Sequence, residues 1–147
     1  MRITILSFEK TGKSPYEDQI EEYKKRVRNR FEISERFLRE DKLSDTNAII
    51  APLLEGLRNS TVCVLDQSGE SMDTNKFTNL LSRAEEKGRQ IVFVIGPHSG
   101  LNKPIRFRYD HIISLSPMTF SHQIARLLLF EQLYRGYSII TGHPYNK

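Results

Sequence analysis

The stretch TVCVLDQSGESMDTNKFTNLLSRAEEKGRQIVFVIG, residues 61–96, carries the pattern that decides the fold class. Its first six residues, TVCVLD, form a β-branched apolar run, which is typical of a strand buried on both faces. Asp73 then predicts the start of a helix that ends before Gly88. One apolar stripe runs along that helix and consists of Phe77, Leu80, Leu81 and Ala84. The run QIVFVIG, residues 90–96, is the strongest strand pattern in the chain, so the stretch predicts a strand–helix–strand unit.

The same alternation continues in both directions from this unit. Strands are predicted at residues 2–8, 31–38 and 111–116. Helices are predicted at residues 14–30, after a capping Asp45, and at residues 121–135, and Pro52 would reset or kink the second of these helices. Short apolar strands that alternate with helices predict an α/β fold with a mostly parallel sheet. A chain of 147 residues without repeat or linker predicts one domain, residues 1–147.

Composition places the chain among ordinary globular proteins. Hydrophobic residues make up 38% of it, and the formal net charge of +4 is compatible with a polyanionic partner without demonstrating one. No apolar run has the length that crosses a bilayer, and the start MRITILSF does not resemble a signal peptide. The single cysteine, Cys63, can form no internal disulfide and is predicted to be buried and unreactive. We therefore expect a cytoplasmic protein without a membrane partner.

The clearest positive cluster is KKRVRNR, residues 24–30, near the end of a predicted helix. One interpretation is a solvated helix face whose cations also suit the negative end of the helix dipole. The other is a patch that contacts phosphates. The sequence slightly favours the first, and only an independent reason to expect nucleic acid would favour the second.

Three predicted strand ends carry unusual loops: VLDQSG (64–69), VIGPHSG (94–100) and SLSPMTF (114–120). In open α/β sheets, ligands bind beyond the carboxyl ends of the strands. Glycines at 69, 96 and 100 would let the backbone approach a ligand closely or adopt a positive φ. The glycine spacing does not match a phosphate-binding loop, no histidine has metal-ligand spacing, and no serine lies in a nucleophile elbow. The loops therefore predict a cleft for a cofactor held by main-chain amides, with no metal.

The predicted helix at 121–135 contains LLLF, residues 127–130, without a polar break. A helix that is apolar on nearly all sides needs cover on both faces, and a second copy of the chain is the simplest source of the second cover. His122 and Arg126 share one side near the third loop and are the better site candidates. Glu131 and Arg135 share the opposite side, where they can simply pair with each other.

The tail GYSIITGHPYNK ends in an imidazole and a phenol beside a stiff proline. His143 and Tyr145 could stack on a base or hydrogen-bond to it. On the pattern alone, a docked tail without a chemical role is about equally well supported.

Four segments, in this order and spacing, resemble the RlmH family: LDQSG, VFVIG with SGL after it, LSPMTFSHQIARLLLFEQLYRGYSI and the terminal HPY. Members of this family are SPOUT-class methyltransferases that modify N3 of a pseudouridine in helix 69 of 23S ribosomal RNA. The resemblance covers nearly the whole chain and is densest from residue 61 onward. It implies a deep C-terminal trefoil knot, a homodimer, S-adenosylmethionine as cofactor, and 23S rRNA in the large subunit or whole ribosome as substrate.

The resemblance also implies site residues. The cofactor positions of the family fall on Leu65, Gly96, Leu115, Ser116, Pro117, Met118, Thr119 and Phe120. For the reaction, the hypothesis is that Arg135 or Arg126 stabilises negative charge on the base and that His122 or His143 takes its proton. Tyr145 would help to hold the base.

The chain departs from the family pattern in the second loop, where Pro97 and His98 follow Gly96 in place of a second glycine. Proline lacks an amide donor, so cofactor affinity or loop mobility could differ. Pro97 is also the feature that supports the main alternative, which is a non-catalytic ribosome- or RNA-binding module on the same scaffold. An α/β enzyme with another nucleotide cofactor is the second alternative, although the chain lacks a phosphate-cradling loop.

Overall fold

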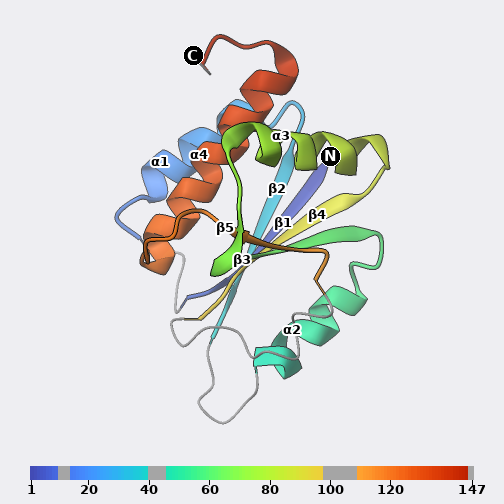
Figure 1. Ribbon diagram of the computed structural model, residues 1–147, viewed down its shortest axis with the longest axis vertical. Helices are drawn as coiled ribbons and strands as arrows, with labels where there is room; N and C mark the ends of the chain where they lie inside the picture. Colours follow the sequence, from blue (N-terminus) through green and yellow to red (C-terminus); the bar gives the residue numbers. More distant parts are fainter. Residues whose placement is uncertain (10–13, 40–45, 98–108, 146–147) are drawn as a thin grey trace.

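The computed structural model describes residues 1–9, 14–39, 46–97 and 109–145. Strands and helices alternate along the described chain up to β4, after which β5 and then α4 follow, as Figure 1 shows. The strands are β1 (Arg2–Phe8), β2 (Glu32–Leu38), β3 (Ser60–Ser71), β4 (Gln90–Ile95) and β5 (His111–Ser114). The helices are α1 (Glu17–Val27), α2 (Thr46–Glu55), α3 (Thr74–Glu86) and α4 (His122–Thr141). Every strand and helix predicted from the sequence is present, although β3 and α4 extend five and six residues beyond their predicted ends.

The described strands form one sheet in the order β2-β1-β4-β3-β5, and every neighbouring pair is parallel. This confirms the predicted α/β class and parallel sheet. The central strand β4 is buried from Ile91 to Ile95, because helices cover both faces of the sheet. The edge strand β2 instead alternates between more and less exposed residues, as the FEISERFL pattern predicts.

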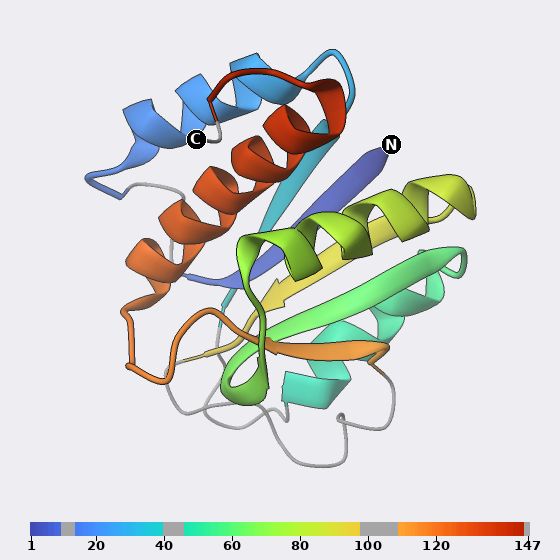
Figure 2. The same cartoon turned by 45° about the horizontal axis from the view of Figure 1, so that its top comes forward.

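Helices α1, α3 and α4 lie on one face of the sheet, with α4 between the other two, and α2 lies on the opposite face (Figures 1 and 2). The larger core lies under the three helices and the smaller one under α2. Leu129 and Phe130 of the LLLF run are fully buried within this single chain. The sequence interpretation assigned the second cover of this helix to another copy, but α1 and α3 supply much of it. Ile124, near the start of α4, stays 36% exposed.

Strand β3 is longer than predicted and irregular in its second half. Its pairing with β5 shifts between Leu65 and Glu70, so the segment between them bulges out of the ladder. Gly69 lies in this bulge, and a Cβ atom there would come within 2.6 Å of the carbonyl oxygen of Ile112. We expected the glycine at 69 to allow a close approach to a ligand, but the close approach is to β5 of the same sheet.

Side-chain caps begin both helices of the C-terminal half. Asp73 accepts a hydrogen bond from the Lys76 amide at 2.7 Å, and Gly88 beyond the helix has a φ of +62°, which confirms the predicted start and end of α3. Ser121 caps α4, which continues past the predicted residue 135 to a left-handed Gly142. Helix α2 runs through Pro52 as one continuous helix.

Several predicted features lie outside the described residues: the capping Asp45, His98 and Gly100. The connection from β4 to β5 includes residues 98–108, and the trefoil knot implied by the family resemblance stays a prediction. Within the described ranges, no helix combines the length and apolar character needed to cross a membrane.

Candidate functional site

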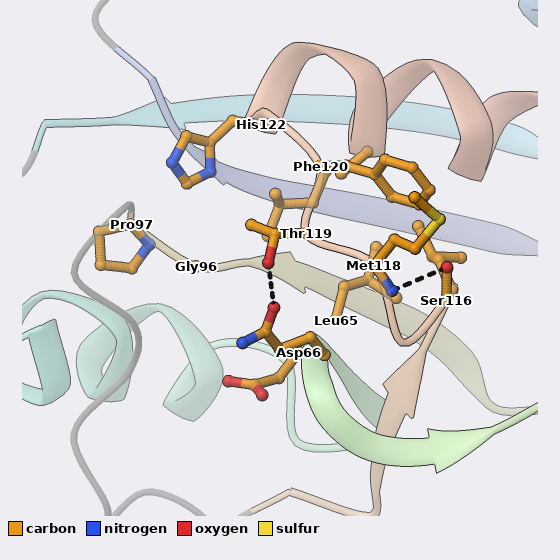
Figure 3. Close-up of a pocket in the computed structure, with 13 residues that line it drawn as sticks. Leu65, Asp66, Gly96, Pro97, Ser116, Met118, Thr119, Phe120 and His122 are labelled. Atoms are coloured by element: carbon orange, nitrogen blue, oxygen red, sulfur yellow. Dashed lines mark hydrogen bonds between the residues drawn. The ribbon is translucent and has the colours of Figure 1, made fainter.

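A cleft of about 320 Å³ opens at the carboxyl ends of β3, β4 and β5, beside the start of α4. Parallel strands and their following loops place it at the edge where α/β sheets bind ligands. Its walls come from the three predicted loops, and Figure 3 shows their side chains around it. The lining residues are Leu65, Asp66, Gln67, Ile95, Gly96, Pro97, Leu115, Ser116, Met118, Thr119, Phe120, His122 and Ala125.

Most residues that the resemblance assigned to the cofactor line this cleft. They are Leu65, Gly96, Leu115, Ser116, Met118, Thr119 and Phe120, whereas Pro117 is not among the lining residues. The assignment missed Asp66 and Gln67, although both stand in the VLDQSG loop that the sequence singles out. Only Asp66 brings an acidic group into the described lining.

Hydrogen bonds hold the loops of the cleft in place. The Thr119 hydroxyl donates to Oε1 of Gln67 at 2.6 Å and thereby ties the third loop to the first (Figure 3). Within the third loop, the Met118 amide donates to Oγ of Ser116 at 3.0 Å. In the first loop, the Asp66 carboxylate accepts from the amide and the hydroxyl of Ser68, at 2.8 and 2.6 Å. The cleft is therefore a pre-formed site whose loops already contact one another.

The rim beside α4 is apolar and exposed. Met118 has 73% of its surface accessible, and Phe120 and Ile124 have 36% each. His122 starts α4 and lines the cleft with Pro97, as Figure 3 shows. The positive end of the α4 dipole lies at this edge, which favours a ligand with negative charge nearby.

Arg126 lies one turn beyond His122 but does not line the cleft. Its side chain is 1% exposed, and Nε and Nη2 donate to the two carboxylate oxygens of Glu35 at 2.7 and 2.8 Å. It also donates to both carboxylate oxygens of Glu17. Burial alone would lower the pKa of Arg126, but the hydrogen bonds to Glu35 and Glu17 outweigh it and keep the pKa above its usual value. The predicted pairing of His122 and Arg126 at one site therefore separates into one cleft residue and one buried ion pair.

Glu9, at the end of β1, completes the charge cluster around Arg126. Neither of its carboxylate oxygens has a hydrogen-bond partner, although both are buried. Burial raises the pKa of Glu9, and the attraction of Arg126 only partly opposes this. The hydrogen bond from Arg126 has the opposite effect on Glu17, because it lowers the pKa of that carboxyl group. Two carboxyl groups near one arginine are thus shifted in opposite directions.

Arg135 and the tail form a second cluster at the other end of α4. Nε of Arg135 donates to Glu131 at 2.5 Å, which confirms the predicted pair, and its guanidinium lies 5.2 Å from the ring centre of Tyr145. Tyr145 also packs against Tyr134, with ring centres 4.3 Å apart, so the tail is docked. The pKa of Tyr23 is raised to about 12, mainly by burial and to a smaller extent by a hydrogen bond with Tyr145.

The two predicted groups of reactive residues do not meet within one chain. Arg135 follows His122 by thirteen residues of continuous helix, which is about 20 Å along the axis at 1.5 Å per residue. His143 follows α4 and accepts a hydrogen bond from the Tyr145 amide at 3.3 Å, so it belongs to the same distant end.

Ion pairs neutralise most of the basic cluster at residues 24–30. Lys24 pairs with Glu21 and Glu35, Arg26 with Glu22, and Arg30 with Glu85. Lys25 and Arg28 are exposed and form no ion pair within the described part of the chain. Within the residues that the structure describes, no group of three or more His, Cys, Asp or Glu side chains could hold a metal ion.

Comparisons with known proteins identify a family and several relatives of this chain. Residues 1–146 match the model of a family described as "Predicted SPOUT methyltransferase". The chain is 36% identical to "Ribosomal RNA large subunit methyltransferase H" of Caldicellulosiruptor saccharolyticus, over 90% of this chain and 91% of that protein. It is 32% identical to the protein of the same name from Campylobacter concisus, over the full length of both.

A shorter match reaches higher identity. A protein of the same name from Solibacter usitatus is 47% identical over 81 residues, which are 55% of this chain and 58% of that relative. The solved structure of the SpoU methyltransferase AviRb from Streptomyces viridochromogenes, in complex with AdoMet, has a TM-score of 0.48 at 9% identity. That likeness covers 90% of this chain and 56% of AviRb, and it is too weak to add to the fold described above.

Proposed function

The chain belongs to the SPOUT methyltransferase family, and from this membership we propose that it methylates large-subunit ribosomal RNA with S-adenosylmethionine as methyl donor. We further propose N3 of a pseudouridine in helix 69 of 23S rRNA as the target atom, within the large subunit or the whole ribosome in the cytoplasm. The names of the full-length relatives support the RNA substrate. The observation that carries the proposal is the cleft, because it lies where the family motif and the strand ends coincide.

The residues of the cleft fit S-adenosylmethionine. A volume of about 320 Å³ lies within the range of small-molecule sites. Leu65, Leu115 and Phe120 offer apolar surface to a planar ring, and Asp66 offers a carboxylate to a cationic group. Gly96 and the loop at 115–120 would hold the polar atoms through the main chain.

When bound, S-adenosylmethionine supplies an electrophilic methyl group. The N3 atom of the target ring carries an imide proton and is a poor nucleophile until that proton leaves. Among the described histidines, His122 lines the cleft, and its imidazole would accept the proton. The ring anion would then take the methyl group, with the methyl carbon–sulfur bond breaking as the N3–carbon bond forms and S-adenosylhomocysteine leaving. A nearby cation would lower the energy of the ring anion before the transfer.

Arg135 suits the role of that cation better than Arg126. Arg126 already directs its donors to Glu35 and Glu17 in a nearly solvent-free position. Arg135 keeps 32% of its side chain exposed. Because about 20 Å of helix separates Arg135 from His122 in one chain, Arg135, His143 and Tyr145 would have to reach the cleft from a second copy. A homodimer of this kind is part of the proposal, and the exposed rim at Met118, Phe120 and Ile124 offers it an apolar surface.

Mass-spectrometric mapping of 23S rRNA tests the proposed function. A strain that lacks the gene should lose the methyl group from one pseudouridine of helix 69, and the intact gene should restore it. The His122→Ala variant should fail to restore it while still giving heat on titration with S-adenosylmethionine. A fully methylated helix 69 in the deletion strain would contradict the proposed target.

The titration with S-adenosylmethionine, together with the mapping of the RNA, distinguishes an enzyme from a non-catalytic module. A module would bind ribosomes but give no heat with S-adenosylmethionine, and no variant would change the methylation of the RNA. Pro97 is the reason to make this measurement, since it removes one amide from the cleft wall.

A further inference from the structure

A second groove, of about 510 Å³, lies between α3 and the edge formed by β3 and β5. None of its lining residues lines the cleft. Cationic side chains dominate its charge, with Lys76, Arg83, Lys87 and Arg89 against Glu70 and Asp110. His111 adds an imidazole to the same wall.

Two cations of α3 and Lys87, directly after its last residue, form one stripe. Lys76, Arg83 and Lys87 are separated by seven and four residues, so they lie on the same side of the helix. The stripe is about 16 Å long at 1.5 Å per residue, which is enough to follow several phosphates of one strand. Asn79, on the same side of α3, adds an amide donor.

The positive charge of the groove is mostly uncompensated. Arg83 and Lys87 are exposed and form no ion pair with any described residue, and Lys76 lies 3.8 Å from Glu70 on the exposed surface. The carboxylate of Asp110 accepts a hydrogen bond from the Val62 amide at 2.8 Å, so it is directed toward the backbone of β3. In the denser cluster at residues 24–30, carboxylates hold Lys24, Arg26 and Arg30. Lys25 and Arg28 of that cluster are exposed and form no ion pair with a described residue, so they serve as the matched comparison.

Neighbouring residues of β3 and β5 link one end of the groove to a loop of the cleft. Met72 lines the groove, and the preceding Ser71 pairs with Ser114, the last residue of β5. The loop at 115–120 that walls the cleft begins directly after Ser114. A strand that lay along α3 would therefore arrive at the cleft by way of this loop.

We propose that the groove between α3 and the β3–β5 edge binds the sugar–phosphate backbone of the RNA substrate and guides one nucleotide toward the cleft. The inference rests on the proposed function. It assigns the phosphate contacts to the groove beside α3, whereas residues 24–30 were the candidate patch in the sequence. Contacts of lysine and arginine to phosphates position a nucleic acid and carry no information about its base sequence. The groove therefore contributes affinity, whereas the cleft selects the base.

A charge-reversal pair with a matched control tests the groove. The test variant is Arg83→Glu with Lys87→Glu, and the control is Lys25→Glu with Arg28→Glu, which removes two exposed, unpaired cations of α1 and changes the net charge equally. Binding of the full chain to purified 23S rRNA and to ribosomes is measured from about 50 to 200 mM salt. Calorimetry with S-adenosylmethionine reports on the cleft in each protein.

We expect the groove variant to bind rRNA about tenfold more weakly than the control and to lower the salt slope by about two, one for each lost phosphate contact. Its binding of S-adenosylmethionine should equal that of the wild type. A milder pair, Arg83→Gln with Lys87→Gln, should give a smaller loss in the same direction, and circular dichroism verifies that each variant is folded.

Equal losses in the groove and control variants, or none in either, would overturn the groove while leaving the methyltransferase proposal intact. A loss on ribosomes but not on purified rRNA would also overturn it, because the partner would then be a ribosomal protein. A wild-type chain that binds neither S-adenosylmethionine nor rRNA would overturn the proposed function and the groove together.

Discussion

Arg126 and Arg135 lie on the same helix, but their surroundings differ in how far each guanidinium group is free to contact a ligand. Arg126, near the cleft end of α4, is 1% exposed and directs four hydrogen bonds to Glu35 and Glu17. Its guanidinium also lies 5.0 Å from the ring centre of Phe37. Arg135, near the tail end, is 32% exposed and pairs with Glu131 beside the ring of Tyr145.

The comparison separates two roles that look alike in a sequence motif. An arginine side chain has five N–H donors, and in Arg126 four hydrogen bonds already go to carboxylates. Little donor capacity therefore remains for a ligand. Arg126 joins β2, α1 and α4 and thereby holds the start of α4 beside the cleft. A partly exposed arginine next to a docked tail can still turn toward a base. We therefore expect Arg126 to matter for stability and Arg135 for the reaction.

The largest effect is expected from Arg126→Ala. The change leaves Glu35 and Glu17 without their buried cation, and broken buried ion pairs typically cost about 3–5 kcal/mol. Urea unfolding at one protein concentration measures the free energy of unfolding, since a dimer makes that quantity depend on concentration.

The double variant Arg126→Met with Glu35→Gln is the control for this prediction. It removes both charges, so it should lose less stability than Arg126→Ala although it changes more atoms. An Arg126→Ala protein of unchanged stability that no longer methylates RNA would reverse the two roles.

The next effect is expected from Arg135→Ala on methyl transfer. Removal of one group that stabilises a developing negative charge typically slows a reaction by roughly 100-fold or more. The free energy of unfolding should change by less than about 1 kcal/mol, because the pair with Glu131 is partly exposed. Single-turnover methylation of ribosomes measures the rate.

His143→Ala and Tyr145→Ala sharpen the same point. If either variant slows methyl transfer as Arg135→Ala does, Arg135 and the tail act as one unit. Full activity in both variants would remove the tail from the mechanism and leave Arg135 to act without it.

A smaller effect is expected from pH within the Arg126 region. The pKa of Glu17 is lowered in the folded protein. Its carboxylate therefore stabilises the fold at pH values above its usual pKa of 4.5, and this contribution is lost as the pH falls through the lowered pKa. Glu9 has a raised pKa when folded, so its favourable contribution exists below the usual value and is lost as the pH rises through the raised pKa.

Two isosteric variants test these opposite signs by urea unfolding across the pH range. At pH of about 7, Glu17→Gln should lower the free energy of unfolding and Glu9→Gln should raise it. Both differences should shrink as the pH falls well below 4.5, where the carboxyl groups become neutral. The same sign for both variants at neutral pH would contradict the assignment.

The smallest effect is expected from Pro97→Ala at the cleft end. Alanine restores the amide donor that proline lacks, and one hydrogen bond contributes about 0.5–1.5 kcal/mol. S-adenosylmethionine should therefore bind roughly threefold to tenfold more tightly, as calorimetry would measure. Unchanged or weaker binding would show that the amide at position 97 does not reach the cofactor.

Much of the fold and of the cleft was predictable from local pattern. The runs at 61–66 and 90–96 and the capped helix between them are strand β3, strand β4 and helix α3. The three loops meet in one cleft because carboxyl ends of parallel strands share an edge of the sheet. Asp66 and Gln67 were within reach of the same argument, since they directly follow a predicted buried strand.

The sequence by itself therefore determined the α/β class, the alternation of elements, the position of the cleft and the pairing of Glu131 with Arg135, because each depends on residues close together in the chain. The tertiary structure alone decided the strand order, the burial of Arg126 against Glu35, ninety-one residues away, and the pairing of Lys24 with Glu35 and of Arg30 with Glu85. Helical periodicity places Arg126 on the side of His122, but only the packing of α4 between α1 and α3 determines which carboxylates meet it. A charge becomes structural or available according to the neighbours that distant segments bring to it.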